Sequence, residues 1–310
     1  MRARQADLAG HAVANDGVRI WYEVHGSGPQ TVFLLPTWPA LDARVWKLQV
    51  PYLARHHRVL VADPRGNGAS DRPTGPEAYA YTRLVADAVA VLDASQTRSA
   101  VCVGLSMGGN VLLQLALAHP ERVDGAVFVA PSVGVDDQEP ACWPTGFEGP
   151  YTGQLGWAQY NAARWQEDLA GFARWFFGEV FCEPHSTKLV DDAVEWTLEA
   201  GADTLIDIQR ARYPGGPTAP SGTSAIRLAG QLRCPSLVLT GDDDRVVDPA
   251  ISRAIAEALG CPLEVVSGGG HGVPARHPVW FNQRLHRFIH GVSARSDDGT
   301  TQEGVTHARP

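Results

Sequence analysis

The most informative segment of this chain is Val103-Gly104-Leu105-Ser106-Met107-Gly108-Gly109, where an apolar strand is followed at once by a helical pattern. It contains a G-x-S-x-G pattern around Ser106. In such a turn the serine has a strained backbone, and the glycines allow a close approach of neighbouring segments. The hydroxyl is then held at the carboxyl edge of a parallel sheet, where open α/β sheets bind ligands. A plain glycine-rich strand–helix turn has the same letters, so the pattern by itself makes Ser106 a candidate nucleophile only.

The segments around this turn alternate between short apolar runs and longer stretches of helical periodicity. Thr31 to Leu35 is a continuous apolar run, which is typical of a strand buried on both faces. Val18 to Val24 alternates apolar and polar residues after a turn, which predicts two antiparallel strands at the start. Further strands are expected at Arg58–Ala62, Ala100–Val103, Val123–Val129, Ser236–Thr240 and Leu263–Val266, and helices at Leu41–Arg55, Tyr81–Ala94, Gly108–Ala118, Pro249–Leu259 and Arg276–Ile289. The alternation predicts an α/β fold with a mostly parallel sheet.

The pattern is interrupted between residues 136 and 230, which lack strand signals and are rich in tryptophan and phenylalanine. Apolar residues recur there at helical spacing, as in Leu189, Val190, Ala193, Val194 and Leu198. We therefore expect a core formed by residues 1–135 and 231–292, with a helical insertion at 136–230. The polar, aperiodic residues 293–310 are expected to form a disordered tail.

Composition excludes several classes of function. The net charge is −8 and no dense Lys/Arg run is present, so nucleic-acid binding is not expected. The five cysteines are odd in number and show neither CxxC nor zinc-site spacing, which argues against a disulfide framework. No signal peptide and no apolar run of about 18 residues is found. These features predict a cytoplasmic protein that acts on a small molecule, without a membrane partner.

A serine nucleophile needs a base, and the base needs a carboxylate. Ser267-Gly268-Gly269-Gly270-His271-Gly272 places His271 in a polar loop after a predicted strand, whereas His277, His286 and His290 are interpreted as closing-helix residues. Four aspartates follow the preceding strand, and composition alone does not choose among them: Asp242, Asp243, Asp244 and Asp248. Asp248 stands before a proline, which suits a helix N-cap.

The chain resembles the α/β-hydrolase superfamily over nearly all of residues 18 to 291. The order nucleophile, acid, base in Ser106, Asp244 and His271 matches that superfamily. Asp63-Pro64-Arg65-Gly66-Asn67-Gly68-Ala69-Ser70-Asp71 resembles its D-x-R-G-x-G-x-S-D loop, and Asp244 stands at the acid's usual distance from Gly241. The resemblance implies an eight-stranded, mostly parallel sheet with helices on both faces and a helical cap after the sixth strand. It implies a branch with a serine triad, similar to esterases, proline iminopeptidases and C–C hydrolases.

One loop departs from this resemblance. Members of the family usually have His-Gly after the third strand, but this chain has Leu35-Pro36-Thr37-Trp38-Pro39. Thr37 is β-branched where glycine is usual, so a positive φ would be costly there. The oxyanion donors are predicted to be the backbone N–H groups of Met107 and Trp38. The expected substrate-binding side chains are those of Thr37, Trp38, Trp143, Trp165 and Trp175.

The function implied by the resemblance is a serine hydrolase that forms an acyl-enzyme on a small, hydrophobic ester, thioester or lactone. A carboxylic ester is the first choice, and neither a cofactor nor a metal is required. C–C bond hydrolysis of the meta-cleavage type is one alternative. Aminopeptidase action is another and would need acidic residues such as Glu179, Glu183, Glu195 or Glu199. A slow or non-catalytic ligand-binding homologue is the third alternative, and monomer and homodimer are both left open.

Overall fold

Eight strands form one sheet in the computed structural model, which describes residues 4–133, 146–212 and 225–300, with side chains as far as residue 294. The strand order is β1-β2-β4-β3-β5-β6-β7-β8. The strands are β1 Leu8–Val13, β2 Arg19–His25, β3 Thr31–Leu34, β4 Arg58–Ala62, β5 Ala100–Leu105, β6 Val123–Val129, β7 Ser236–Gly241 and β8 Leu263–Val266. β1 pairs with β2, and β2 with β4, in antiparallel fashion, and all later pairs are parallel. The predicted eight-stranded, mostly parallel sheet is confirmed.

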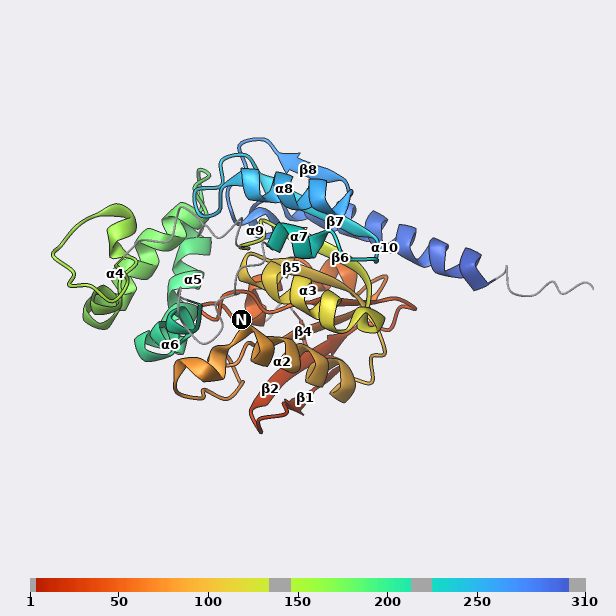
Figure 1. Ribbon diagram of the computed structural model, residues 1–310, viewed down its shortest axis with the longest axis horizontal. Helices are drawn as coiled ribbons and strands as arrows, with labels where there is room; N and C mark the ends of the chain where they lie inside the picture. The colour runs from red at the N-terminus through yellow and green to blue at the C-terminus, as the bar shows by residue number, and fades with distance from the viewer. Residues whose placement is uncertain (1–3, 134–145, 213–224, 301–310) are drawn as a thin grey trace, which may run out of the picture.

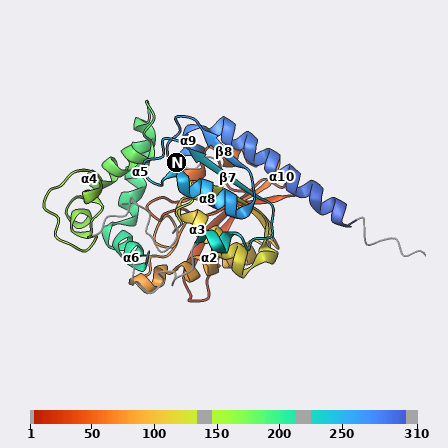
Figure 2. The same cartoon turned by 45° about the horizontal axis from the view of Figure 1, so that its top comes forward.

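Helices cover both faces of this sheet, as Figure 1 and Figure 2 show. Successive residues of a strand point to opposite faces. Accordingly, Phe33 belongs to one apolar core and its neighbours Val32 and Leu34 to the other. The first core packs against α2 (Tyr81–Ala94), α3 (Met107–Ala118) and α8 (Pro249–Leu259), and the second against α1 (Val50–Leu53) and α10 (Pro278–Thr300). Burial on both faces explains why the central strands are continuous apolar runs.

The helix predicted at Leu41–Arg55 is wrong as a single element. The structure has a 3-10 turn, η1 (Ala43–Trp46), and then the single turn of α1. Asp42 caps the first of these, because its carboxylate accepts the N–H of Arg44 at 2.8 Å. Pro51 lies in the first turn of α1, where its missing N–H costs nothing, but the same residue cannot continue a helix from residue 47.

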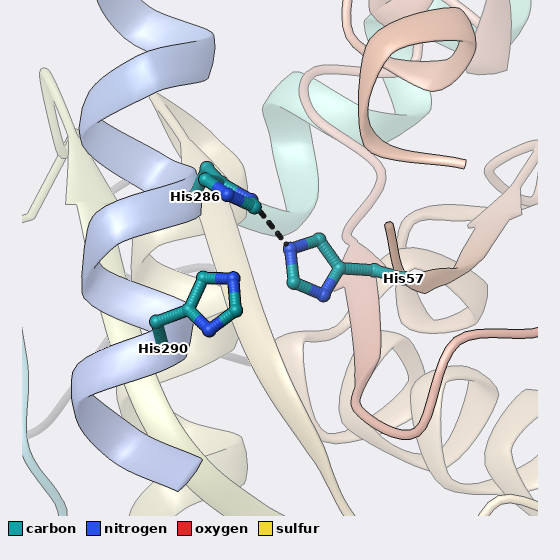
Figure 3. A group of neighbouring side chains, drawn as sticks. All are labelled: His57, His286 and His290. Carbon is teal, nitrogen blue, oxygen red and sulfur yellow. Dashed lines mark hydrogen bonds between the residues drawn. The ribbon is translucent and has the colours of Figure 1, made fainter. Parts of the chain in front are cut away.

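The predicted closing helix is present, although it is divided and longer than expected. α9 (Val273–Arg276) precedes α10, and Pro278 separates them. The expectation of a disordered tail from residue 293 is wrong as far as Thr300, since α10 continues to that residue. Val292 is buried against the sheet, and the chain has no proline between 279 and 309 that would end the helix. His286 and His290 lie on α10 as predicted, beside His57 (Figure 3).

The segment expected to be a helical insertion contains three long helices: α4 (Ala162–Val180), α5 (Thr187–Ala200) and α6 (Ala202–Arg212). These insertion helices gather on one side of the molecule, opposite the side from which α10 projects (Figure 1). The short turns η2 (Pro76–Tyr79), η3 (Pro120–Arg122) and η4 (Gly156–Gln159) connect larger elements, and α7 (Ala225–Ala229) packs against α3 and α8. The insertion helices therefore stand apart from the helices that cover the sheet.

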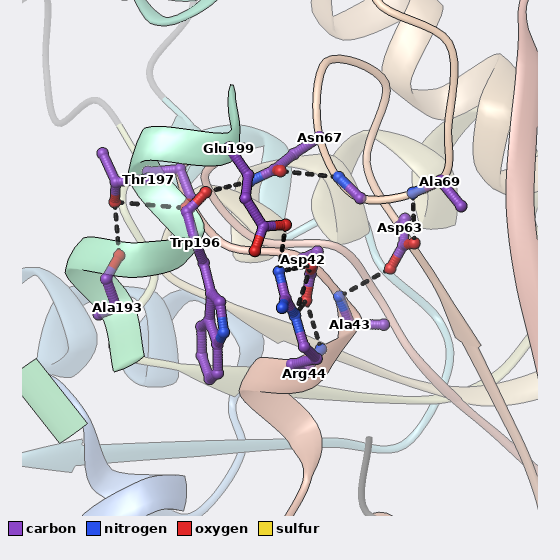
Figure 4. Close-up of polar contacts among 12 residues, drawn as sticks. Asp42, Ala43, Arg44, Asp63, Asn67, Ala69, Ala193, Trp196, Thr197 and Glu199 are labelled. Atoms are coloured by element: carbon purple, nitrogen blue, oxygen red, sulfur yellow. Dashed lines mark hydrogen bonds and ion pairs between the residues drawn. The ribbon is translucent and has the colours of Figure 1, made fainter. Parts of the chain in front are cut away.

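Polar contacts attach α5 to two core loops (Figure 4). The Asn67 side chain donates to the carbonyl oxygens of Pro39 at 2.9 Å and Trp196 at 3.1 Å. Arg44 pairs with Glu199 at 2.6 Å, and Lys47 pairs with Asp192. Both cations also lie 5.2 Å from the centre of the Trp196 ring. The loop that resembles D-x-R-G-x-G-x-S-D thus contributes to holding the insertion on the core.

Candidate active site

Ser106 occupies the sharp turn between β5 and α3. Its backbone angles are φ 53° and ψ −118°, a strained combination for any residue other than glycine. The conformation is fixed on both sides, because Ser106 N–H donates to the Val129 carbonyl at 2.9 Å and the Ser106 carbonyl accepts the N–H of Ser132 at 3.0 Å. Its side chain is only partly buried. The turn therefore holds the hydroxyl at the carboxyl edge of the sheet, as predicted.

Gly104 and Gly108 are required by close packing around this turn. A Cβ at Gly104 would lie 2.3 Å from the Gly108 carbonyl oxygen, and a Cβ at Gly108 would lie 2.6 Å from that of Pro36. Real Cβ atoms do not approach backbone so closely. The loop after β3 consequently rests directly on the first turn of α3.

His271 and Asp244 lie together, on the loops that follow β8 and β7. His271 Nδ1 and Asp244 Oδ2 are 2.7 Å apart, and both side chains are buried. The other carboxylate oxygen of Asp244 accepts the N–H groups of Val246 at 2.8 Å and Val247 at 2.9 Å. These bonds fix the orientation of the carboxylate toward the imidazole.

The other three aspartates of this loop are engaged elsewhere. Asp242 accepts the N–H of Gly268, and Asp243 pairs with Arg245 at 3.1 Å. Asp248 accepts the N–H of Ala250 at 2.8 Å and caps α8, as the sequence predicted. Only Asp244 has the geometry to orient His271.

Ser106 and His271 line the same apolar cavity between the sheet edge and α4. No hydrogen bond joins the two side chains, which both belong to the described part of the chain. Such bonds are often long before substrate binds and shorten in the reactive complex. The cavity brings the predicted nucleophile and base to one apolar space.

The altered loop after β3 keeps its position by a side-chain bond. Thr37 Oγ1 donates to the Leu105 carbonyl at 2.9 Å, and Leu35 N–H donates to the Val103 carbonyl at 3.0 Å. Thr37 is not among the described residues with positive φ, so the strain expected of a β-branched residue does not arise. Within the described residues, the N–H groups of Trp38 and Met107 have no hydrogen-bond acceptor.

The loop carrying His271 is attached to the end of α4. The N–H of Gly270 donates to Glu183 Oε1 at 2.9 Å, and the N–H of Gly272 donates to the Val180 carbonyl at 3.2 Å. Cys182 lies beside this loop, and burial raises the pKa of its thiol to about 11. The thiol therefore stays protonated near neutral pH and does not compete as a nucleophile.

The aromatic side chains that line the cavity differ from those expected. Thr37 and Trp38 line it as predicted, but Trp165 and Trp175 are not among its described lining residues. Trp165 is fully buried, and both tryptophans pack against Phe172. Trp143 lies outside the described residues. The aromatic lining comes instead from three phenylalanines of α4 and its end: Phe176, Phe177 and Phe181.

The sequence analysis missed these phenylalanines because α4 has aromatic residues on more than one side. Phe177 lies in the last turn of α4, and its ring stacks on that of Phe181, the residue that follows the helix. Without the orientation of α4, these aromatic residues suit an internal core and a cavity wall equally well.

A second cavity lies behind the loop after β3. Thr37 and Met107 line it together with Leu84 and Val111, so it is enclosed by the sheet, α2 and α3. Arg65 borders it, fully buried, and pairs with Asp87 at 2.6 Å and Asp16 at 2.9 Å. Thr37 thus stands between the two cavities.

Comparisons with known proteins agree with this geometry. Residues 30–278 match the family model of the alpha/beta hydrolase fold. The chain is 40% identical over 271 residues to the 2-hydroxymuconate semialdehyde hydrolase of Pseudomonas sp. (strain CF600), covering 86% of this chain and 85% of that protein. It is 27% identical over 282 residues to a putative carbamate hydrolase RutD of Variovorax paradoxus (strain S110), covering 88% of this chain and 97% of that protein.

A solved structure shows the same fold. The esterase EaEST from Exiguobacterium antarcticum superposes with a TM-score of 0.75 at 22% identity, covering 91% of this chain and 99% of that one. The protein described here belongs to the alpha/beta hydrolase fold family, and it is a hydrolase. Among the described residues, no helix combines the length and apolar character that crossing a bilayer requires.

Proposed function

We propose that this hydrolase uses a Ser106–His271–Asp244 triad to cleave a small, apolar ester, thioester or lactone through an acyl-enzyme. The observation that carries the proposal is the 2.7 Å contact between His271 and Asp244 at the cavity that Ser106 also lines. A triad is recognised by its geometry and by the roles of its members. The strained backbone of Ser106 and the oriented carboxylate of Asp244 both support it.

In the proposed reaction, Ser106 Oγ attacks the carbonyl carbon while His271 Nε2 takes the hydroxyl proton. Asp244 stabilises the imidazolium that forms, and the N–H groups of Met107 and Trp38 bind the oxyanion. The C–O or C–S bond then breaks, and His271 gives its proton to the leaving group. Water attacks the acyl-enzyme with the same base, which releases the acid and restores Ser106.

The insertion helices serve as a cap in this proposal. The cavity wall opposite Ser106 is formed by Phe176, Phe177 and Phe181, all from α4 and its end. Such a wall favours an apolar acyl or alcohol group. The cap would therefore select substrates by size and hydrophobicity.

C–C bond hydrolysis is the second candidate, because the relative with 40% identity is named as a 2-hydroxymuconate semialdehyde hydrolase. The proposed nucleophile, base and oxyanion donors suit a carbonyl next to a cleavable C–C bond as well. A vinylogous keto acid and an aryl ester of similar size, assayed on the same protein, distinguish the two. Faster turnover of the keto acid by more than tenfold would replace the ester proposal.

Aminopeptidase action has less support from the cavity. Of the described residues that line it, none is an aspartate or a glutamate that would hold a substrate amine. Glu183 accepts the N–H of Gly270, and Glu199 pairs with Arg44. Both carboxylates have structural partners instead.

The decisive experiment is active-site labelling with a fluorophosphonate, together with turnover of short-chain aryl esters. Wild-type protein should label stoichiometrically and hydrolyse at least one ester. Ser106→Ala should lose both activities while keeping the wild-type melting temperature. Stoichiometric labelling that persists in Ser106→Ala would assign the nucleophile elsewhere, and a folded wild type that neither labels nor turns over any ester would favour a ligand-binding homologue.

A further inference from the structure

Three histidines from two segments that are distant in the sequence meet beside the amino end of β4 (Figure 3). His286 and His290 are four residues apart on α10, so their side chains project from one face of that helix. His57 stands directly before β4, at its amino end. One ring nitrogen of each lies within 4.8 Å of the others, and His57 Nε2 is 3.0 Å from His286 Nδ1.

These separations suit a shared divalent cation. Zn–N bonds of about 2.0–2.1 Å in tetrahedral geometry place two ligand nitrogens about 3.3 Å apart. The separation between His57 Nε2 and His286 Nδ1 is 3.0 Å, close to that value, and the other separations are at most 4.8 Å. Small rotations of the His286 and His290 side chains, which are less buried than His57, would bring all three nitrogens to it.

The hydrogen bond between His57 and His286 uses only one ring nitrogen of His57. His57 Nδ1 is buried and has no hydrogen-bond partner among the described residues. A neutral imidazole binds a metal ion through one ring nitrogen, so His57 has the donor type that such a site needs.

We propose that His57, His286 and His290 form a binding site for one transition-metal dication, with Zn²⁺, Ni²⁺ or Cu²⁺ as the preferred class. Three imidazoles without a carboxylate suit these ions, whereas Mg²⁺ and Ca²⁺ require oxygen ligands. The exposure of His290 leaves a coordination position open to water. Two histidines at i and i+4 on a helix are a recurring metal-binding pair.

The site would act on the fold and not on the reaction. It lies at the amino end of β4, whereas Ser106 follows the carboxyl end of the parallel strand β5. A metal there would link α10 to the connection before β4, two segments separated by more than two hundred residues of sequence. Binding to the folded state alone raises its stability by mass action.

The test uses tag-free, chelator-treated full-length protein, because an affinity tag of histidines would bind the same ions. Isothermal titration with Zn²⁺ should show one equivalent bound with a dissociation constant in the micromolar range or tighter. The melting temperature should rise by several degrees with Zn²⁺ and stay unchanged with Mg²⁺ or Ca²⁺. Ester turnover should change by less than twofold.

Variants show whether these residues are the ligands. His290→Ala is the main variant, because an exposed side chain can be removed without unfolding the protein. It should weaken Zn²⁺ binding at least tenfold and abolish the shift in melting temperature. His119→Ala, an exposed histidine elsewhere, is the matched control and should bind as the wild type does. No binding by the wild type, or equal binding by His290→Ala, would overturn the proposal, and an unchanged affinity in His286→Ala would remove that residue from the ligand set.

Discussion

Asp244 is the residue whose role a single substitution tests best, because three neighbouring aspartates are available for comparison. Asp244→Asn keeps an oxygen that can accept the N–H groups of Val246 and Val247 but removes the charge beside His271. We expect kcat to fall about 10³–10⁴-fold with little change in KM, since the imidazolium loses its stabilising charge. Steady-state kinetics on an aryl ester measure both constants.

Asp243→Asn is the control for that substitution. Asp243 is exposed and pairs with Arg245, so its loss should change kcat by less than twofold. A large fall in Asp243→Asn together with normal turnover in Asp244→Asn would move the acid to a different residue.

Thr37 tests how the altered loop is held. Thr37→Val has nearly the same shape but leaves the buried Leu105 carbonyl without its hydroxyl donor. We expect a loss of about 1–3 kcal/mol in the free energy of unfolding, measured by urea denaturation. We also expect kcat to fall, since the neighbouring N–H of Trp38 is the proposed oxyanion donor. Thr37→Ser keeps the hydroxyl and should retain most of the free energy of unfolding and most of kcat. Equal losses in the two variants would mean that the bond to Leu105 contributes to neither.

For single residues, the sequence predicted which side chains belong to the candidate site better than it predicted their hydrogen-bond partners. The resemblance selects Asp244 among four aspartates by its distance from Gly241, and the structure places it against His271. The catalytic roles of both stay predictions. The Thr37 bond could not be predicted, because its acceptor is the carbonyl of a residue 68 positions away. A threonine in place of glycine is visible in a sequence, but the group that compensates for it is not.

At the scale of helices and loops, Glu183 is a candidate for positioning His271, because it follows α4 and binds the loop that carries His271. Glu183→Ala removes the acceptor of the Gly270 N–H, one residue before His271. A misplaced base costs about tenfold to hundredfold in rate, so we expect kcat to fall by that factor while Asp244 and Ser106 remain in place. Stopped-flow acylation with an activated ester measures the step directly.

Glu183→Gln distinguishes positioning from stability. The amide oxygen of glutamine can accept the same N–H, so this variant should recover at least half of the wild-type rate. If Ala and Gln variants lose activity equally while both keep the wild-type melting temperature, the hydrogen bond to Gly270 does not position the base.

Helices and strands were predicted correctly where one hydrophobic pattern, either a continuous apolar run or helical periodicity, extended along the whole segment. The central strands are buried on both faces, and the predicted bounds of α2 and α8 match those of the structure. The prediction failed at Leu41–Arg55, because Pro51 prevents the residues before it from continuing into α1 as one helix. It failed again after residue 293, because α10 continues without an apolar face in the sequence to signal it.

For the whole molecule, the contacts of α5 with the core determine how firmly the proposed cap is held. Arg44 and Lys47 pair with Glu199 and Asp192 and lie over the ring of Trp196. The double variant Arg44→Gln, Lys47→Gln removes these charges. We expect KM to rise about threefold to tenfold with kcat nearly unchanged, because the cavity wall loses part of its support while the triad is untouched.

Two controls test whether the rise in KM comes from the loss of these ion pairs: high ionic strength and the removal of an ion pair elsewhere on the surface. High ionic strength should raise the wild-type KM toward that of the double variant, since partly exposed ion pairs are screened. Arg174→Gln breaks an exposed pair with Asp191 on the outside of the insertion and should leave KM unchanged. An equal rise in Arg174→Gln would assign the effect to net charge and not to the attachment of α5.

The overall architecture was predictable because it depends on the order of elements, which a sequence shows directly. The alternation of strands and helices predicted the parallel sheet, and its interruption after residue 135 predicted the insertion helices. The lining of the cavity depends on how α4 is rotated above Ser106, and no local pattern records that rotation. Phe176, Phe177 and Phe181 could therefore be identified as wall residues only from the structure.

The two bonds that join Gly270 and Gly272 to the end of α4 bear on how new specificities arise in this enzyme. Exchanging the insertion for that of a relative would replace the cavity wall and, at the same time, the groups that hold the base. A productive chimera must therefore bring its own acceptor at the position of Glu183 and a helix that ends on a carbonyl placed like that of Val180. Recombination at the insertion boundaries alone would yield proteins that bind a new substrate but turn it over poorly. Selection for activity would therefore keep the insertion helices and the His271 loop together.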